Sequence, residues 1–405
     1  MRRLELLDGL RGYFLVFMLL NHLSFTGGYL LVKVNHGELG FVQDAQGFVF
    51  LSGLLIGMVY ARRMARQGFG AGAAAIWNRS AELYAYALGC ILVVLAAAAV
   101  LPGAQRVWEP WLGRELAWGD GWFLAAAAAM IYQPTYMDIL PQYIIYLILA
   151  PPLVWLCMTG RWAWVAAGCA VSWFIVQLGL HLPVAGAINA GLGAMHDGLT
   201  LRAHFNVLAW QVIFMGGLVL GVLTAKGDID WKRVFDPHRP GLAVIAAAFV
   251  FVFLVWRLTA ANVPLSAEIW DRFHVHGNRG EFALIFLLNF VALGYLVAWL
   301  LMAGPQAATG WVRRVGRFMN GLFSLSFLRL LGRHSLQVYA WHVLLVYLLK
   351  VVDHHFGPFN ELTKTAIALG AVALLAVPAL WREGGWRALI SGGVEDGTAK
   401  GAGAR

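Results

Sequence analysis

Charge and cysteine are both scarce in this sequence of 405 residues. Only 13% of the residues are charged, whereas 60% are hydrophobic and the mean hydropathy is +0.69. Soluble domains carry about twice this share of charge, so the composition excludes a soluble globular protein and predicts one that crosses a membrane several times. The three cysteines, Cys90, Cys157 and Cys169, lie scattered in apolar segments. We therefore expect no disulfide framework and no metal site.

The net charge of +9 could indicate a nucleic-acid-binding protein, but the basic residues lie mostly in short connections between apolar segments. Ten apolar segments are long enough to cross a bilayer. Their approximate bounds are 11–32, 42–61, 80–101, 139–158, 161–182, 205–224, 241–260, 282–303, 334–352 and 362–381. Alternate connections are much richer in arginine and lysine, which places both termini in the cytoplasm. The sequence therefore predicts an all-α integral membrane protein with about ten transmembrane helices in one bundle.

The apolar pattern shows no internal repeat and is not interrupted by a soluble domain. We therefore expect one polytopic membrane domain over residues 1–385. Residues 386–405 form a polar, basic end that predicts a flexible cytoplasmic tail.

The first apolar segment contains ionisable side chains, which are costly inside a bilayer and usually mark functional sites. It opens with Asp8-Gly9-Leu10-Arg11-Gly12 and continues to His22. On a helix Arg11 and His22 share a face and lie about 16 Å apart, so His22 is expected near mid-membrane. Asp8 is one turn before Arg11 and can pair with it. The alternative interpretation is that these polar groups only hold helices together.

Four arginines lie at the cytoplasmic ends of the second and third segments. They are Arg62, Arg63, Arg66 and Arg79. They can simply fix the membrane topology. Alternatively, they can bind phosphate, because a guanidinium group matches the geometry of phosphate oxygens.

The second segment contains small residues at Ser52, Gly53 and Gly57. Small residues one helical turn apart allow the backbones of two membrane helices to approach closely. We expect this face of the segment to pack against another helix.

Other polar side chains lie in the outer half of the predicted bundle. Asp44 begins the second segment, Tyr136 and Asp138 precede the fourth, and Asn206 and Gln211 belong to the sixth. These groups could bind a polar substrate at the outer surface. Alternatively, the two amides could only join neighbouring helices.

A second histidine, His342, lies in the ninth segment, eight residues beyond His334 at its cytoplasmic end. This spacing corresponds to about 12 Å along a helix, so His342 is expected at a depth similar to that of His22. The two histidines could border one substrate cavity. A purely structural hydrogen bond is the alternative role for His342.

The longest outer connection, 102–138, carries four tryptophans and a short apolar stretch, 122–132, that cannot cross a membrane alone. The tryptophans are Trp108, Trp111, Trp118 and Trp122. Tryptophan is typical of the membrane interface. Aromatic rings at an outer surface can also stack on the apolar faces of sugars.

Taken in order, these stretches resemble the membrane-bound acyltransferase family 3 superfamily. Arg11, ten residues and His22 resemble its Arg-x10-His signature, although Glu82 stands where a second arginine often follows the one at Arg79. More narrowly, the chain resembles the OpgC branch, which adds succinyl groups to periplasmic glucans. The stretches that carry this resemblance are 48–54, 136–152, 205–211 and 331–349.

The resemblance implies a multi-pass enzyme of the bacterial inner membrane that uses cytoplasmic acyl-CoA, in this branch succinyl-CoA, and an outer glucan acceptor. His22 would be the general base or, alternatively, a nucleophile that carries the acyl group. Arg11 would position a carboxylate or stabilise negative charge, and Asp8 would hold Arg11 in place. The inner arginines, Arg79 first among them, would bind the phosphates of CoA.

Two other functions remain open. A secondary transporter or flippase could use His22 and Arg11 as a proton relay, although the sequence lacks the paired broken segments in matching halves that transporters commonly show. A sensory or scaffold protein with buried polar groups is the third interpretation. Neither of these proteins would release free CoA from an acyl-CoA.

Overall fold

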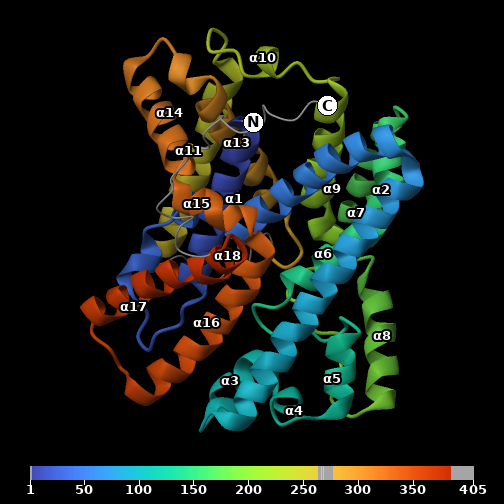
Figure 1. Cartoon of the computed structure of the whole chain (residues 1–405), viewed down its shortest axis with the longest axis vertical. Helices are drawn as coiled ribbons and strands as arrows, with labels where there is room; N and C mark the ends of the chain where they lie inside the picture. The colour runs from blue at the N-terminus through green and yellow to red at the C-terminus, as the bar shows by residue number, and fades with distance from the viewer. Residues whose placement is uncertain (1, 263–265, 267, 269–276, 385–405) are drawn as a thin grey trace, which may run out of the picture.

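The computed structural model describes residues 2–262, 266, 268 and 277–384, and within them the chain is almost entirely helical (Figure 1). The long helices are α1 (Arg2–His22), α2 (Asp44–Val100), α6 (Ile139–Met158), α7 (Trp162–Gln177), α8 (Leu182–Met195), α9 (Val207–Lys226), α11 (Gly241–Asn262), α13 (Leu284–Met302), α14 (Gly310–Phe323), α16 (Ser335–Phe356) and α17 (Glu361–Leu374). The short ones are η1 (Leu30–Lys33), η2 (His36–Leu39), α3 (Ala104–Leu112), α4 (Arg114–Ala117), α5 (Gly121–Ala128), α10 (Trp231–Val234), η3 (Gly304–Gln306), α15 (Ser326–Arg333) and α18 (Ala376–Arg382). The expected tail, 386–405, lies outside the described residues.

Seven helices of the described chain are long and apolar enough to cross a membrane, or eight if α7 and α8, bent by 71°, form one span. The prediction of an all-α membrane protein is therefore confirmed. This count differs from the ten expected spans partly because α2 joins the second and third segments. Gly68, with a φ of 83°, breaks the helical geometry inside α2, and Figure 1 shows the ribbon reversing direction at its upper right corner.

The first helix is also absent from this count, because α1 carries too many charged residues to qualify by composition. It ends at His22, whereas the sequence predicted an apolar segment running on to residue 32. Residues 26 and 27 form a turn after α1, and η1 follows. The polar pair Asn21 and His22 therefore lies at the end of a helix.

Helix α1 occupies the interior, where it contacts α2, α15, α16 and α17. Its approach to α15 is very close: a Cβ atom on Gly12 would lie 1.9 Å from the carbonyl oxygen of Leu328. The glycines of the Asp-Gly-Leu-Arg-Gly stretch therefore have a packing role. In contrast, α8 has no buried residue among its side chains.

The outer connection folds into α3, α4 and α5, and the tryptophans expected at a membrane interface or on a sugar-binding surface differ in burial. Trp108 is buried, and its Nε1–H donates to the carbonyl oxygen of Tyr347 at 2.9 Å. Trp118 and Trp122 are 54% and 52% exposed. Trp108 is thus a core residue, whereas the exposed pair suits an interface with lipid or sugar.

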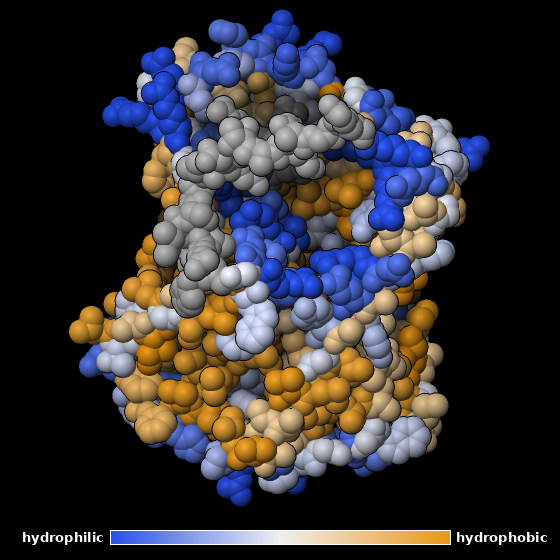
Figure 2. All heavy atoms as spheres, in the orientation of Figure 1, coloured by the Kyte–Doolittle hydropathy of each residue, from blue (hydrophilic) through white to orange (hydrophobic). Residues whose placement is uncertain are grey.

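Figure 2 shows the distribution of polarity on one face of the molecule. The lower half is covered mostly by apolar side chains, as a surface in contact with lipid requires. The upper half is hollowed, and hydrophilic side chains gather on the walls of this hollow, between the corner of α2 and the layer formed by α1 and α15. The face shown in Figure 2 therefore carries a polar hollow above an apolar band.

Helices α2 and α9 are in intimate contact through glycine. A Cβ atom at Gly53 of α2 would lie 2.0 Å from the carbonyl oxygen of Phe214 in α9. A Cβ atom at Gly217 of α9 would lie 2.3 Å from the carbonyl oxygen of Phe50 in α2. The close packing predicted for Gly53 and Gly57 is therefore present, and Gly217 and Gly221 of α9 match it from the other side.

We expect Gly217→Val to destabilise the protein, because overpacking a tight contact costs about 1–3 kcal/mol. The measurement is thermal unfolding of the purified protein in detergent. Gly216→Val is the matched control on the same helix, since a Cβ atom there meets nothing within 4 Å. Equal melting temperatures for the two variants would contradict the close α2–α9 contact.

Candidate functional site

Two histidines predicted at similar depth meet in the structure. Nδ1 of His22, the last residue of α1, lies 3.2 Å from Nε2 of His342 in α16. The Nδ1–H of His342 donates to the carbonyl oxygen of Tyr339. A neutral imidazole has one N–H, so this bond leaves Nε2 of His342 as an acceptor and requires Nδ1 of His22 to donate.

This assignment leaves Nε2 of His22 unprotonated, and no described residue hydrogen-bonds to it. His22 is the residue of the pair that lines a cavity, whereas His342 is completely buried. The structure thus gives His342 a contact with His22 and not with the cavity. His22 presents a basic nitrogen, and His342 fixes its tautomer and orientation.

The cavity beside His22, which we call the outer cavity, has a volume of about 660 Å³. Tyr136, Asp138 and Asp44 line it, so the structure brings these three predicted residues together with His22. The ring of Tyr136 lies against that of His22, with centroids 4.3 Å apart. Tyr136 has a φ of 70°. Such a volume and polar lining suit a sugar-sized ligand.

Asp44 is almost fully buried at the start of α2 and is held by polar neighbours. The amide of Asn21 donates to its Oδ2 at 2.5 Å, and Nε2 of His36 lies 3.6 Å from its Oδ1. The hydroxyl of Tyr13 is 3.2 Å from Nδ1 of His36. Asp44 therefore joins the end of α1 to the start of α2 at the cavity wall.

Arg11 lies in a different place from His22. It lines a narrow space of about 20 Å³, which we call the inner cavity, together with Arg79, Ser52, Tyr143 and other residues. Nη2 of Arg11 donates to the hydroxyl of Ser335, and its Cζ lies 5.6 Å from the ring centroid of Phe48. The Nε atom of Arg11 is buried without a described acceptor. The structure thus brings Arg11 and Arg79, but not His22, into one cavity.

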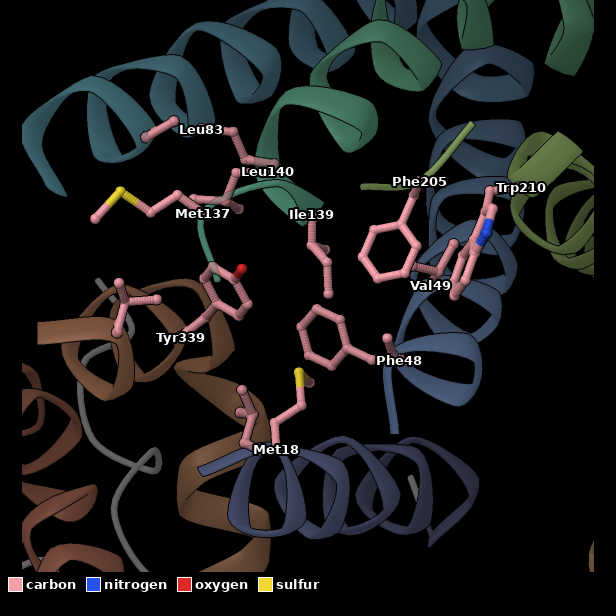
Figure 3. Close-up of a cluster of buried hydrophobic side chains, with 14 of the residues drawn as sticks. Met18, Phe48, Val49, Leu83, Met137, Ile139, Leu140, Phe205, Trp210 and Tyr339 are labelled. Atoms are coloured by element: carbon pink, nitrogen blue, oxygen red, sulfur yellow. The ribbon is translucent and has the colours of Figure 1, made fainter. Parts of the chain in front are cut away.

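An apolar barrier separates the two cavities. Ile139 lines both, Phe48 and Tyr339 line the inner one, and Met18 lines the outer one. Figure 3 shows these four side chains directed toward one another from four different helical segments. All four are buried, and water and ions pass a packed apolar contact of this kind only if the side chains move.

The remaining inner residues are distributed along the cytoplasmic part of the predicted bundle. Arg62, Arg63 and Arg66 are exposed on α2 before Gly68 and do not line the inner cavity. Arg79 pairs with Glu82 at 2.5 Å. Asp8 lies on α1, but no ion pair between Asp8 and Arg11 is present in the described part of the chain.

The two amides predicted from the sixth segment are not at the outer cavity. Asn206 caps α9, where its side-chain oxygen accepts from the backbone N–H of Leu208 at 3.0 Å. Gln211 donates to the carbonyl oxygen of Cys169 at 2.8 Å and lines a lateral apolar cavity. The Gln211 contact joins α9 to α7, which was the alternative interpretation, whereas the Asn206 contact is a local cap of α9.

Sequence reasoning missed several residues of the outer cavity. Arg202, His204, Arg257 and Arg279 all line it. The arginines were considered only as determinants of topology or not at all, since they lie far apart in the sequence. Arg257 inside an apolar segment was the available signal, because a charge there is costly. Within the described residues, no group of three or more histidine, cysteine, aspartate or glutamate side chains could hold a metal ion.

Comparison with known proteins agrees with the ordered set of motifs. A family model described as OpgC protein matches residues 2–386. Neither the curated proteins nor the solved structures contain a match. Because the family match extends over nearly the whole sequence of 405 residues, this chain belongs to the OpgC family.

Proposed function

We propose that this protein transfers an acyl group, in particular succinyl, from cytoplasmic acyl-CoA to a hydroxyl of a periplasmic glucan, with His22 as general base. Membership of the OpgC family indicates a glucan-modifying acyltransferase of the membrane. The observation that carries the proposal is the hydrogen-bonded pair of His22 and His342, which leaves Nε2 of His22 as a basic nitrogen on a residue that lines the outer cavity.

In the proposed reaction, Nε2 of His22 takes the proton of a glucan hydroxyl while the hydroxyl oxygen attacks the thioester carbonyl. The new C–O bond forms, the C–S bond breaks, and the thiolate of CoA accepts the proton from His22. The products are a glucan ester and free CoA. A neutral imidazole suits this work because its ordinary pKa is near neutrality.

The donor would approach through the inner cavity, where Arg11 and Arg79 lie. Arg11 is about 16 Å from His22 along α1, so it would hold a part of CoA remote from the reacting carbonyl. The hydrophilic hollow of Figure 2 offers an entrance for the charged nucleotide. For the thioester to reach His22, the side chains of Phe48 and Ile139 must move apart.

We further propose ten spans in the bacterial inner membrane, with both termini in the cytoplasm. The two limbs of α2 would each be a span, α7 and α8 together one more, and α1 another despite its charges. Enclosure of α1 by α2, α15, α16 and α17 supports this count, because a buried helix does not need an apolar surface.

Reporter fusions test this topology. Fusions after Thr224 and after Ala303 should report the cytoplasm, and fusions near Gly113 and Gly277 should report the periplasm, because the basic connections are retained inside. A cytoplasmic signal near Gly113 would contradict the arrangement.

For the donor site, we expect Arg79→Ala to raise the KM for acyl-CoA about tenfold or more, as loss of a charge-assisted hydrogen bond does. The KM for the glucan should remain unchanged. Arg62→Ala is the matched control, because it removes an exposed arginine that does not line the inner cavity.

Arg79 also pairs with Glu82, so Glu82→Gln shows what loss of that ion pair alone does. An unchanged donor KM in Arg79→Ala would remove Arg79 from the site. An equal rise in Glu82→Gln would assign the effect to local structure.

The catalytic assignment is tested with His22→Gln and His22→Ala. Both should lower the rate of transfer about 10²–10⁴-fold, because neither side chain can accept a proton at neutral pH. The measurement is release of CoA from succinyl-CoA in the presence of glucan, together with the mass of the modified glucan, at matched concentrations of folded protein. A transporter or scaffold would release no CoA in the wild type, and near-normal turnover of His22→Gln would exclude His22 as the base.

A further inference from the structure

The outer cavity contains three arginines whose guanidinium groups are satisfied very differently. Arg202 donates to four neutral oxygens: the Tyr132 hydroxyl at 2.7 Å, the Trp111 carbonyl at 3.0 Å, and the Pro110 carbonyl and Thr135 hydroxyl at 3.4 Å. These bonds join the outer connection to the segment before α9. The hydrogen bonds of Arg202 therefore explain its place at the cavity by a structural role.

Arg279 has no such explanation. Its Nε atom is buried without an acceptor, and its guanidinium donates no hydrogen bond to any described residue. The same holds for Arg257 of α11. Leaving a buried donor without a hydrogen-bond partner costs about 1–3 kcal/mol of folding free energy, and more when the group is charged. Two such arginines on one cavity wall are therefore a reason to look for a ligand.

The position of Arg279 is nevertheless well defined. Its carbonyl oxygen accepts from the indole N–H of Trp210 at 3.0 Å, and its guanidinium carbon lies 5.2 Å from the ring centroid of Phe205. These contacts fix the backbone and stack the guanidinium on an aromatic ring, and they leave its N–H groups available. The group is thus held in place before a ligand arrives, which favours binding.

The charges around Arg279 are only partly balanced. Asp44 and Asp138 lie in the same cavity, but neither forms an ion pair with Arg279 within the described residues. Burial lowers the pKa of Arg279, and the two carboxylates oppose that shift. Burial also raises the pKa of Asp138 to about 6, so Asp138 can take up a proton at modest cost when an anion enters.

We propose that Arg279, with Arg257 beside the same cavity, binds the terminal carboxylate of the acyl group that is transferred. The inference rests on the proposed function. With the thioester carbonyl at His22, the distal end of a dicarboxylic acyl group extends into the outer cavity, which Arg279 also lines. A guanidinium can hold a carboxylate through two parallel hydrogen bonds. Arg279 would then distinguish acyl groups with a terminal carboxylate from those without one.

The test compares two donors, succinyl-CoA and butyryl-CoA, which differ at the distal end of a four-carbon acyl chain. Arg279→Gln should lower kcat/KM for succinyl-CoA about 10- to 100-fold, as loss of hydrogen bonds to a charged group does. The value for butyryl-CoA should not fall. Arg279→Lys keeps the charge but not the paired donors, so its kcat/KM for succinyl-CoA should lie between those of the wild type and Arg279→Gln. Arg239→Gln, at an 80% exposed side chain outside the cavity, is the control.

Three results would overturn the proposal. An equal fall with both donors would make Arg279 a structural residue, and no fall with succinyl-CoA would remove it from the site. A fall seen only with a glucan that carries acidic substituents would assign its ligand to the acceptor.

A second measurement does not depend on turnover. Succinate should raise the melting temperature of the wild-type protein and not that of Arg279→Gln, since only a folded site binds it. If succinate stabilises the wild type selectively but no CoA is released from any donor, the proposed function fails and the carboxylate site stands. If succinate changes the melting temperatures of the wild type and Arg279→Gln equally, the carboxylate site is excluded, whatever the activity.

Discussion

The ionisable side chains of α1 impose the constraint on which the rest of the structure depends. Glu5, Asp8, Arg11 and His22 belong to one helix, and a charged helix cannot face lipid without partners. The surrounding helices supply them: Arg329 pairs with Glu5 at 2.9 Å, Ser335 accepts from Arg11, and His342 contacts His22. Enclosure of α1 by α2, α15 and α16 therefore places Arg11 and His22 in the interior, while Glu5 stays exposed and α8 remains at the periphery.

The apolar barrier follows from the same arrangement. A transferase whose substrates arrive from opposite sides needs a path for an acyl chain and no continuous path for ions. The buried side chains of Phe48, Ile139, Tyr339 and Met18 suit such a requirement, because they can rotate to admit an acyl chain and their apolar packing disfavours ions (Figure 3). Under the proposed function, Arg11 and Arg79 hold the donor on one side of this barrier and His22 meets the acceptor on the other.

Patterns confined to one helix were the most predictable part of the molecule. The helical membrane character follows from apolar length, and the close contact at Gly53 follows from small residues at helical spacing. The sequence placed Arg11 and His22 on one face of a helix, but it did not show that they line different cavities. Helix α1 runs past the apolar barrier, so Arg11 lies at the inner cavity and His22 at the outer one. The sequence could not show that one cavity is lined by Arg202, Arg257 and Arg279, since only the fold brings their separate segments together.

The end of α1 shows why a local pattern is insufficient at the site itself. Asn21 and His22 are adjacent, yet Asn21 donates to Asp44 of α2 while His22 contacts His342 of α16. Two neighbouring residues thus tie three helices together at the floor of the outer cavity. Since His22 is the last helical residue, the orientation of its imidazole depends on α16 as much as on α1. A change in the packing of α16 would therefore redirect the basic nitrogen even if α1 itself did not move.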